Sequence, residues 1–187
     1  MTSAIETTSD VYRLLKNMGV TPRGVQLAAI ESGLLEGRSI MVCSPTGSGK
    51  TLVGEMGLLR AVTDGSRGLY LVPLRALAGQ VFTLLHDHYS DQGYSVGIST
   101  GDYQDYGQDL AEYDIVVTTY ERGDSLLRHN AEWLRGVGCI VIDEIQTLGE
   151  GLRGARLEGL IMRMRRLVEN LQIVALSATV GSPEALA

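Results

Sequence analysis

Residues 44–51 read Ser44-Pro45-Thr46-Gly47-Ser48-Gly49-Lys50-Thr51, and this stretch decides the fold expected of the chain. It matches the phosphate-binding pattern G-x-x-x-x-G-K-[S/T] except at the first position, where Ser44 replaces glycine. Residues 39–43 before it form an apolar run typical of a buried strand, and residues 52–62 after it place apolar side chains on one helical face. Because a P-loop requires strand, loop and helix in this order, the sequence predicts an α/β domain that binds a nucleotide.

The residue types in this loop each have a chemical reason to contact a nucleotide. Gly47 and Gly49 let the backbone curl so that its N–H groups point at phosphate oxygens, and the N-terminus of the next helix adds a favourable dipole. We expect Lys50 to reach the β- and γ-phosphates of ATP and the Thr51 hydroxyl to ligate Mg²⁺. The other candidates for nucleotide contacts are Ser44, Pro45, Thr46 and Ser48. The alternative is an ordinary Gly/Ser-rich turn that happens to precede Lys and Thr.

A pair of carboxylates follows a second apolar run, at residues 138–142. The run is typical of a buried strand and ends on Asp143 and Glu144, at the C-terminal edge where open α/β sheets bind ligands. We expect Asp143 to hold Mg²⁺ and Glu144 to polarise the water that attacks the γ-phosphate. Lys50, Asp143 and Glu144 are therefore the predicted catalytic residues. The competing interpretation is that the two acids only cap the following helix.

Apolar runs and helical segments alternate along the remaining chain, without internal repeats or low-complexity linkers. Further strands are expected at residues 68–72, 94–98, 115–118 and 172–176, and helices at residues 75–88, 121–129 and 153–166. This alternation favours a parallel sheet with right-handed crossovers, in which every strand ends on the same edge. Residues 9–36 are expected to form a helical preface that packs on this core.

Length and composition fit one globular domain. The chain has 187 residues, of which 44% are hydrophobic, and a formal net charge of −6 at pH 7. An acidic protein is not expected to bind nucleic acid over its whole surface, so such contacts must be local. Residues 153–166 carry five arginines at positions between apolar residues. We interpret this segment first as an ordinary amphipathic helix and second as a DNA-facing surface.

The sequence gives no sign of a membrane or disulfide-bonded protein. No apolar stretch approaches the roughly 20 residues that span a bilayer, and the N-terminus lacks the pattern of a signal peptide. A cytoplasmic location without membrane contact is therefore expected. Cys43 and Cys139 each fall in an expected buried strand, where cysteine behaves as a small hydrophobe, so neither a disulfide nor a metal site is expected.

Five short segments occur in the order found in one large enzyme family. Residues 46–51, 73–78, 116–121, 143–146 and 177–179 look like motifs I, Ia, Ib, II and III, respectively. On these segments the chain resembles the DExH-box helicases of superfamily 2, and within them the Ski-type group. Residues 99–103 and 124–129 are in addition similar to the archaeal Ski-type DNA helicases associated with repair of stalled replication forks.

The resemblance implies a RecA-like P-loop domain, with a mostly parallel sheet and helices on both faces. It also implies ATP and Mg²⁺ as cofactors and 3′-to-5′ unwinding of single-stranded or forked DNA at replication forks, in repair or recombination. Motifs Ia and Ib hold the sugar-phosphate backbone in this family, a role that falls here on Arg75, Gly101, Thr118 and Thr119. Groups of these types bind phosphate without reading bases, so RNA remains an alternative substrate.

The resemblance assigns three coupling residues and one adenine contact. Motif III, here Ser177 and Thr179, connects the nucleotide to a second motor domain in this family, and Gln146 of motif II is expected to take part. Gln146 stands where the group carries His, which removes any proton-dependent role but keeps hydrogen-bonding capacity. Gln26 lies where a family glutamine recognises adenine, although residues 21–25 lack the prolines usual before it.

The domain organisation follows from the same resemblance. We expect residues 1–187 to be the ATP-binding first motor domain, with residues 1–37 as the preface that carries Gln26. The motifs of a second RecA-like domain do not follow in this sequence, so the chain is expected to be an isolated first domain that hydrolyses ATP slowly. The alternative outside the enzymes is a nucleotide-binding module that never hydrolyses ATP.

Overall fold

A six-stranded parallel sheet forms the centre of the protein in a computed structural model, which describes residues 2–101, 108–129, 132–149 and 151–178. The strands are β1 (Ile40–Cys43), β2 (Arg67–Val72), β3 (Val96–Ser99), β4 (Ile115–Thr119), β5 (Val137–Ile142) and β6 (Gln172–Ser177). Their order in the sheet is β1-β6-β5-β2-β4-β3, and each neighbouring pair is parallel. The α/β fold with a parallel sheet that the sequence predicts is therefore confirmed.

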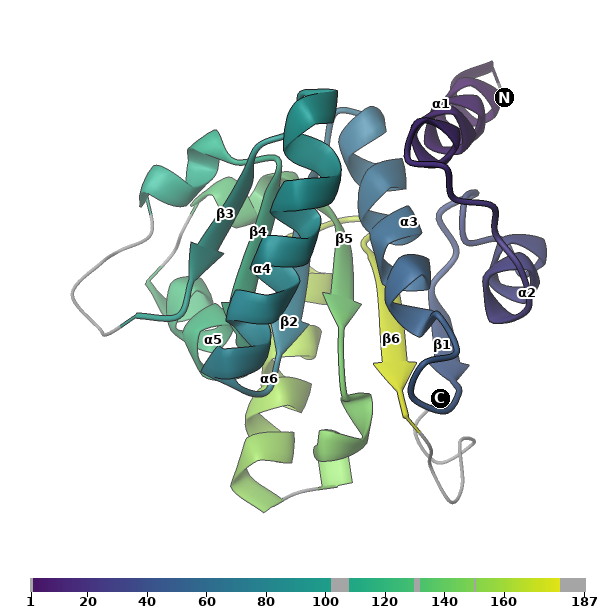
Figure 1. The fold of residues 1–187 in the computed structure, drawn as a ribbon. Coiled ribbons are helices and arrows are strands. Elements are labelled where there is room, and N and C mark those ends of the chain that lie inside the picture. Colours follow the sequence, from purple (N-terminus) through teal and green to yellow (C-terminus); the bar gives the residue numbers. More distant parts are fainter. Residues whose placement is uncertain (1, 102–107, 130–131, 150, 179–187) are drawn as a thin grey trace.

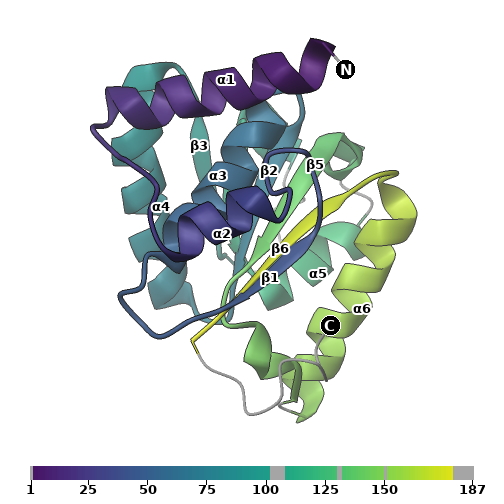
Figure 2. The ribbon, with the colours of Figure 1, turned by 90° about the vertical axis from the view of Figure 1, so that its right-hand side faces the viewer.

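Helices cover both faces of this sheet (Figure 1). The helices are α1 (Thr2–Asn17), α2 (Val25–Glu31), α3 (Lys50–Thr63), α4 (Arg75–Tyr89), α5 (Tyr120–Arg128) and α6 (Gly151–Leu167). Short 3₁₀ turns lie at η1 (Ser90–Gln92), η2 (Gln108–Glu112), η3 (Glu132–Gly136) and η4 (Ile145–Gly149). Helices α3 and α4 pack on one face, α5 and α6 pack on the other, and α1 and α2 lie beside α3 at the β1 end (Figures 1 and 2).

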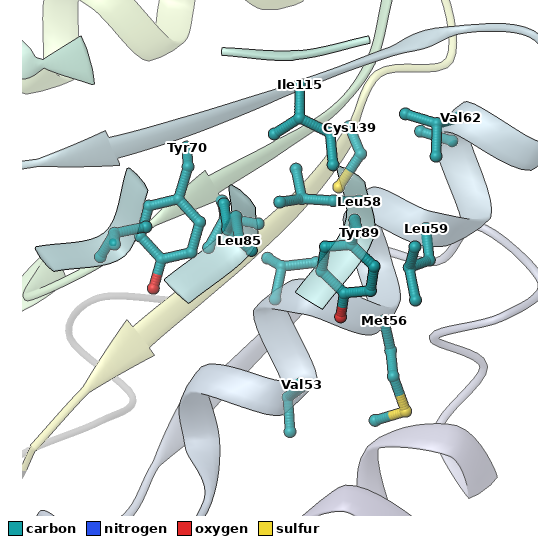
Figure 3. Close-up of a cluster of buried hydrophobic side chains, with 14 of the residues drawn as sticks. Val53, Met56, Leu58, Leu59, Val62, Tyr70, Leu85, Tyr89, Ile115 and Cys139 are labelled. Atoms are coloured by element: carbon teal, nitrogen blue, oxygen red, sulfur yellow. The ribbon is translucent and has the colours of Figure 1, made fainter. Parts of the chain in front are cut away.

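The period-two alternation of side chains divides the strands between two hydrophobic cores. In β2, Tyr70 and Val72 belong to the core under α3 and α4, whereas Leu69 and Leu71 belong to the core under α5 and α6. Both sets are buried, which explains why the strands read as continuous apolar runs. Figure 3 shows the first core, where side chains of α3 and α4 meet those of the sheet.

Helix α3 approaches the sheet closely at two glycines. A Cβ atom on Gly54 would lie 2.9 Å from Val141 Cγ1, and one on Gly57 would lie 2.8 Å from Val174 Cγ2. These separations are too short for real Cβ contacts, so only glycine lets the helix sit this near β5 and β6. The close approach fixes the N-terminus of α3, where the P-loop ends, over the edge of the sheet.

The described structure extends or corrects three expectations. The preface begins as a helix at Thr2 rather than at residue 9, and it packs on the core through Val11, Leu14 and Leu15. Cys139 is buried as expected, but the expectation for Cys43 is wrong: this residue ends the edge strand β1 and is exposed. Within the described ranges, no helix combines the length and apolar character needed to cross a membrane.

Helix α6 is amphipathic, as its spacing predicts. It buries Leu157, Leu160 and Met164 against the second core. Its arginines at positions 153, 156, 163, 165 and 166 are exposed. The apolar face of α6 therefore stabilises the fold, while the arginine face is in contact with solvent.

Replacing Leu160 by alanine tests the packing of α6. We expect Leu160→Ala to lower the free energy of unfolding by about 2–5 kcal/mol, because a fully buried leucine loses both its transfer energy and its packing contacts. Leu152→Ala, in the same helix but at a side chain that is 85% exposed, should change it by less than about 0.5 kcal/mol. Urea denaturation followed by circular dichroism measures both values, and equal losses would contradict the described packing.

Candidate functional site

Three segments that lie far apart in the sequence meet at one edge of the sheet. Strands β1, β6 and β5 are neighbours, so the P-loop after β1, Ser177 at the end of β6 and Asp143 after β5 lie side by side. The Ser44 amide donates to the Ser177 carbonyl oxygen at 3.1 Å, and the Asp143 amide donates to the Leu71 carbonyl oxygen at 2.9 Å. Motifs I, II and III therefore share one edge, as the parallel topology predicts.

The P-loop has the geometry of a phosphate cradle. Gly47 and Gly49 have φ values of 80° and 86°, in the left-handed region that glycine adopts readily. The hydroxyl oxygen of Ser48 is buried and has no hydrogen-bond partner within the described part of the chain, and Lys50 at the start of α3 is 8% exposed. A buried hydroxyl and a buried ammonium group at a helix N-terminus are donors suited to phosphate, so the residues present fit ATP.

Asp143 lies partly buried beside the P-loop and is held by two donors. The Tyr70 hydroxyl donates to Asp143 Oδ2 at 3.1 Å, and the Glu144 amide donates to Asp143 Oδ1 at 3.0 Å. Burial raises the pKa of Asp143 above its ordinary value, against the opposing effects of the Tyr70 hydrogen bond and of nearby Lys50. Carboxylate and hydroxyl oxygens are ligands that Mg²⁺ prefers, so Asp143 and Thr51 remain the predicted metal ligands.

The backbone of Glu144 adopts an unusual conformation. Its φ is 56°, a left-handed value that costs a residue other than glycine about 1–3 kcal/mol. The Glu144 carbonyl oxygen accepts from the Thr147 amide at 3.0 Å and from the Thr147 hydroxyl at 2.9 Å. The Tyr120 hydroxyl donates to the Asp143 carbonyl oxygen and lies 3.4 Å from that of Glu144. Three hydrogen bonds, two from Thr147 and one from Tyr120, thus hold the strained turn that carries the Glu144 side chain.

Gln146 connects motif II with motif III. Its side-chain amide nitrogen donates to Glu144 Oε2, and its oxygen accepts from the Ser177 hydroxyl at 2.8 Å. The chain Glu144–Gln146–Ser177 gives the predicted coupling residues a direct physical path, which a glutamine provides without a proton transfer. Thr179, the third predicted coupling residue, lies outside the described residues.

Gln26 contacts the P-loop rather than an open pocket. Its side-chain nitrogen donates to the Gly49 carbonyl oxygen at 3.1 Å, its oxygen accepts from the Arg23 amide at 2.9 Å, and it is 8% exposed. A Cβ atom on Gly49 would displace this side-chain nitrogen, so the observed Gln26 contact depends on glycine at position 49. Recognition of adenine by Gln26 therefore stays a prediction, and the contact with Gly49 is a feature that the sequence did not indicate.

A pocket of about 300 Å³ lies beyond the ends of β2, β3 and β4. It is lined by Pro73, Leu74, Arg75, Thr100, Gly101, Thr119, Glu121, Arg122 and Ser125. Three of the four residues predicted to hold a nucleic-acid backbone, Arg75, Gly101 and Thr119, are among them. The fourth, Thr118, is fully buried and donates its hydroxyl to the Ser99 carbonyl oxygen at 2.6 Å, so it supports the pocket from beneath.

Two pocket residues were missed by the sequence reasoning. Arg122 is 6% exposed, and its Nε donates to the Ser99 hydroxyl at 3.0 Å. Its position one turn into the helix after motif Ib was the available signal. Ser125 lies one turn further along α5 and is also buried. Thr119 is the N-cap of α5, and Thr119, Arg122 and Ser125 all line the same pocket.

Comparison with known proteins agrees with this arrangement. A family model for the DEAD/DEAH box helicases matches residues 23–186. The chain belongs to the DEAD/DEAH box helicase family. It is similar to proteins named ATP-dependent DNA helicase Hel308, with 44% identity in Methanococcus vannielii (96% of this chain, 24% of the relative) and 41% in Pyrococcus horikoshii (95% and 24%). The predicted resemblance to archaeal DNA helicases is therefore confirmed, and this helicase domain spans about a quarter of the length of those relatives.

Solved structures with the same fold are also helicases. The helicase MrfA superposes with a TM-score of 0.77 at 26% identity, over 94% of this chain and 30% of that one. The helicase Lhr of Mycobacterium smegmatis, solved with single-stranded DNA and AMP-PNP, superposes with a TM-score of 0.76 at 28% identity, over 95% of this chain and 25% of that one. The RecA-like fold that the sequence predicts is confirmed for this helicase domain, and its family uses a nucleotide.

Replacing Gln146 tests the connection between motifs II and III. We expect Gln146→Ala to lower the rate of ATP hydrolysis about tenfold, because two hydrogen bonds worth about 0.5–1.5 kcal/mol each orient Glu144 and Ser177. The dissociation constant for a non-hydrolysable ATP analogue should change by less than about twofold, since the side-chain hydrogen bonds of Gln146 in the described structure go to Glu144 and Ser177. Steady-state hydrolysis and equilibrium binding measure the two quantities.

The matched control is Gln92→Ala, which removes a glutamine bonded to the His88 carbonyl oxygen at the end of α4. Gln92→Ala should retain both the rate of ATP hydrolysis and the dissociation constant for the analogue. Equal losses of hydrolysis and analogue binding in Gln146→Ala would contradict a coupling role, because they would indicate a damaged loop instead.

Proposed function

We propose that this chain is the ATP-binding motor domain of an ATP-dependent DNA helicase that moves 3′ to 5′ and acts at replication forks in repair or recombination. The observation that carries the proposal is the meeting of the P-loop, Asp143 and Glu144, and Ser177 at one sheet edge, next to a pocket that contains Arg75 and Thr119. The names of the Hel308 relatives support DNA as the substrate.

The nucleotide site derives its chemistry from the loop and from motif II. The backbone of residues 45–49, with the N-terminus of α3, would surround the phosphates, and Lys50 would contact the β- and γ-phosphates. Mg²⁺, held by Thr51 and Asp143, would neutralise charge on the phosphates. Glu144 would accept a hydrogen bond from the attacking water and orient it, a role that depends on the turn held by Thr147.

The pocket suits a phosphodiester backbone because two helix N-termini converge on it. Helix α4 begins at Arg75, its N-cap Leu74 makes no side-chain cap hydrogen bond, and α5 begins one residue after Thr119. Helix dipoles, an arginine and a hydroxyl attract phosphate without contacting bases. The helicases Lhr and MrfA, which superpose on this chain, were solved bound to DNA with AMP-PNP, and this supports the assignment.

We further assign residues 1–187 to the first RecA-like domain, with residues 1–37 as its preface. Relatives about four times as long leave room for a second RecA-like motor domain. That domain would face the edge carrying motifs II and III and complete the ATP site. The experiment that tests the whole proposal is ATP hydrolysis measured alone, with single-stranded DNA and with RNA of the same length. Stimulation by RNA alone would favour the RNA helicase alternative.

Replacing Lys50 tests the nucleotide site. We expect Lys50→Ala to weaken binding of a fluorescent ATP analogue by about ten- to a hundredfold, because a charge-assisted hydrogen bond to phosphate is worth about 1.5–3 kcal/mol. The sequence has one other lysine, Lys16, which is exposed on α1, so Lys16→Ala is a matched control that should bind normally. If both variants bound like the original protein, the P-loop assignment would fail.

Replacing Arg75 tests the pocket. We expect Arg75→Ala to weaken binding of a fluorescent oligothymidylate about threefold to tenfold. The slope of the logarithm of the association constant against the logarithm of the salt concentration should become shallower by about one, because one fewer counterion is released. Arg165→Ala removes an exposed arginine of α6 and should leave both quantities unchanged. Fluorescence anisotropy at several salt concentrations measures them. A larger loss in Arg165→Ala would move the nucleic-acid contact to α6.

A further inference from the structure

Tyr120 lies between the pocket and motif II. It is the first residue of α5, and the residues on either side of it, Thr119 and Glu121, line the pocket together with Arg122. The Tyr120 side chain points the other way: it is 1% exposed and belongs to the core under α5 and α6. A single residue therefore has its backbone at the pocket and its ring in the core.

The hydroxyl of Tyr120 reaches the backbone of both motif II carboxylates. It donates to the Asp143 carbonyl oxygen and lies 3.4 Å from the Glu144 carbonyl oxygen. Burial raises the pKa of Tyr120 well above its ordinary value, so the hydroxyl stays protonated and remains a donor. Both acceptors are backbone carbonyl oxygens. Tyr120 therefore affects the backbone position of residues 143 and 144 rather than the charge of their carboxylates.

We propose that Tyr120 is a positioning residue that couples occupancy of the pocket to the orientation of Glu144. This inference rests on the proposed function, because it requires the pocket to hold a nucleic-acid strand and Glu144 to orient the attacking water. Tyrosine has few rotatable bonds, so its buried ring transmits a displacement of the α5 N-terminus to its hydroxyl.

The pocket is built so that a ligand there acts on the N-terminus of α5. The Thr119 hydroxyl caps the helix by accepting from the Arg122 amide at 3.3 Å, and Arg122 Nε is bonded to Ser99 at 3.0 Å. A phosphate oxygen accepts hydrogen bonds, so it would compete with the Thr119 hydroxyl for the Arg122 amide and with the Ser99 hydroxyl for Arg122 Nε. The first competition changes the cap of the helix that Tyr120 begins. At the other end of the path, the Asp143 carbonyl that accepts from Tyr120 directly precedes Glu144, whose φ of 56° is strained. A changed hydrogen bond at this carbonyl therefore alters the turn that orients Glu144.

The competing explanation is that the hydroxyl only satisfies a buried polar group. Tyr89 provides the comparison, because it is also fully buried and its hydroxyl donates to Glu55 Oε2 at 2.6 Å in the other core. Tyr89 belongs to α4, and in the described part of the chain its hydroxyl bonds to Glu55 of α3 rather than to motif II. Tyr120→Phe and Tyr89→Phe therefore each remove one hydroxyl from a buried ring, but only the first removes a hydroxyl from the path.

The decisive quantity is the thermodynamic coupling between the two sites. The dissociation constant of AMP-PNP with Mg²⁺ is measured with and without saturating oligothymidylate, and the ratio of the two values is the coupling factor. We expect a factor of about five or more in the original protein, a factor near one in Tyr120→Phe and an unchanged factor in Tyr89→Phe. Each ligand alone should bind Tyr120→Phe within about twofold of the original, which shows that the variant is folded.

Reciprocity supplies an internal check, because the nucleotide must change the affinity for the oligonucleotide by the same factor. A coupling factor in Tyr120→Phe equal to that of the original protein would overturn the inference and leave the proposed function standing. The inference would also be overturned if the original protein bound both ligands but had a coupling factor of one. Failure of the original protein to bind AMP-PNP or oligothymidylate would instead refute the proposed function, and the inference with it.

Discussion

The parallel pairing of β1, β6 and β5 is the constraint on which the site depends. Residues 44 and 177 are far apart in the chain, yet the register that places Cys43 opposite Ser177 brings their loops together. Pairing of β5 with β6 then places Asp143 beside them. A slip of one residue would exchange the two faces of a strand and remove its side chains from their core, so hydrophobic packing holds the catalytic edge in register.

Strain at the site is offset by hydrogen bonds from three elements of the fold. The left-handed backbone of Glu144 and the burial of Asp143, which raises its pKa, both oppose folding. Thr147, Tyr70 and Tyr120 offset these costs from three different elements. These hydrogen bonds hold Glu144 in a backbone conformation that is unfavourable for a residue other than glycine.

The sequence predicts what depends on local pattern. Apolar runs identify the six strands because both sheet faces are covered, and the spacing in residues 44–51 identifies the P-loop. Contacts between elements are beyond such patterns. Thr118 is a polar residue predicted to face a ligand, but β4 is an inner strand and Ser99 on β3 supplies its partner. The contacts of Tyr120 and Gln26 likewise depend on packing across the chain rather than on spacing within it.

The charge of the domain constrains how it can hold a strand. A net charge of −6 repels a polyanion at long range, so attraction must come from groups that act within a Debye length, about 8–10 Å. In the pocket, Glu121 adds another negative charge, and Arg153 lies 3.7 Å from it and compensates for it. If the pocket holds a strand as proposed, it would depend on directed donors, namely helix N-termini, Arg75 and hydroxyls, more than on net charge. Under the proposed function, donors of this kind would fix the position of a nucleic-acid backbone against the ends of β2, β3 and β4.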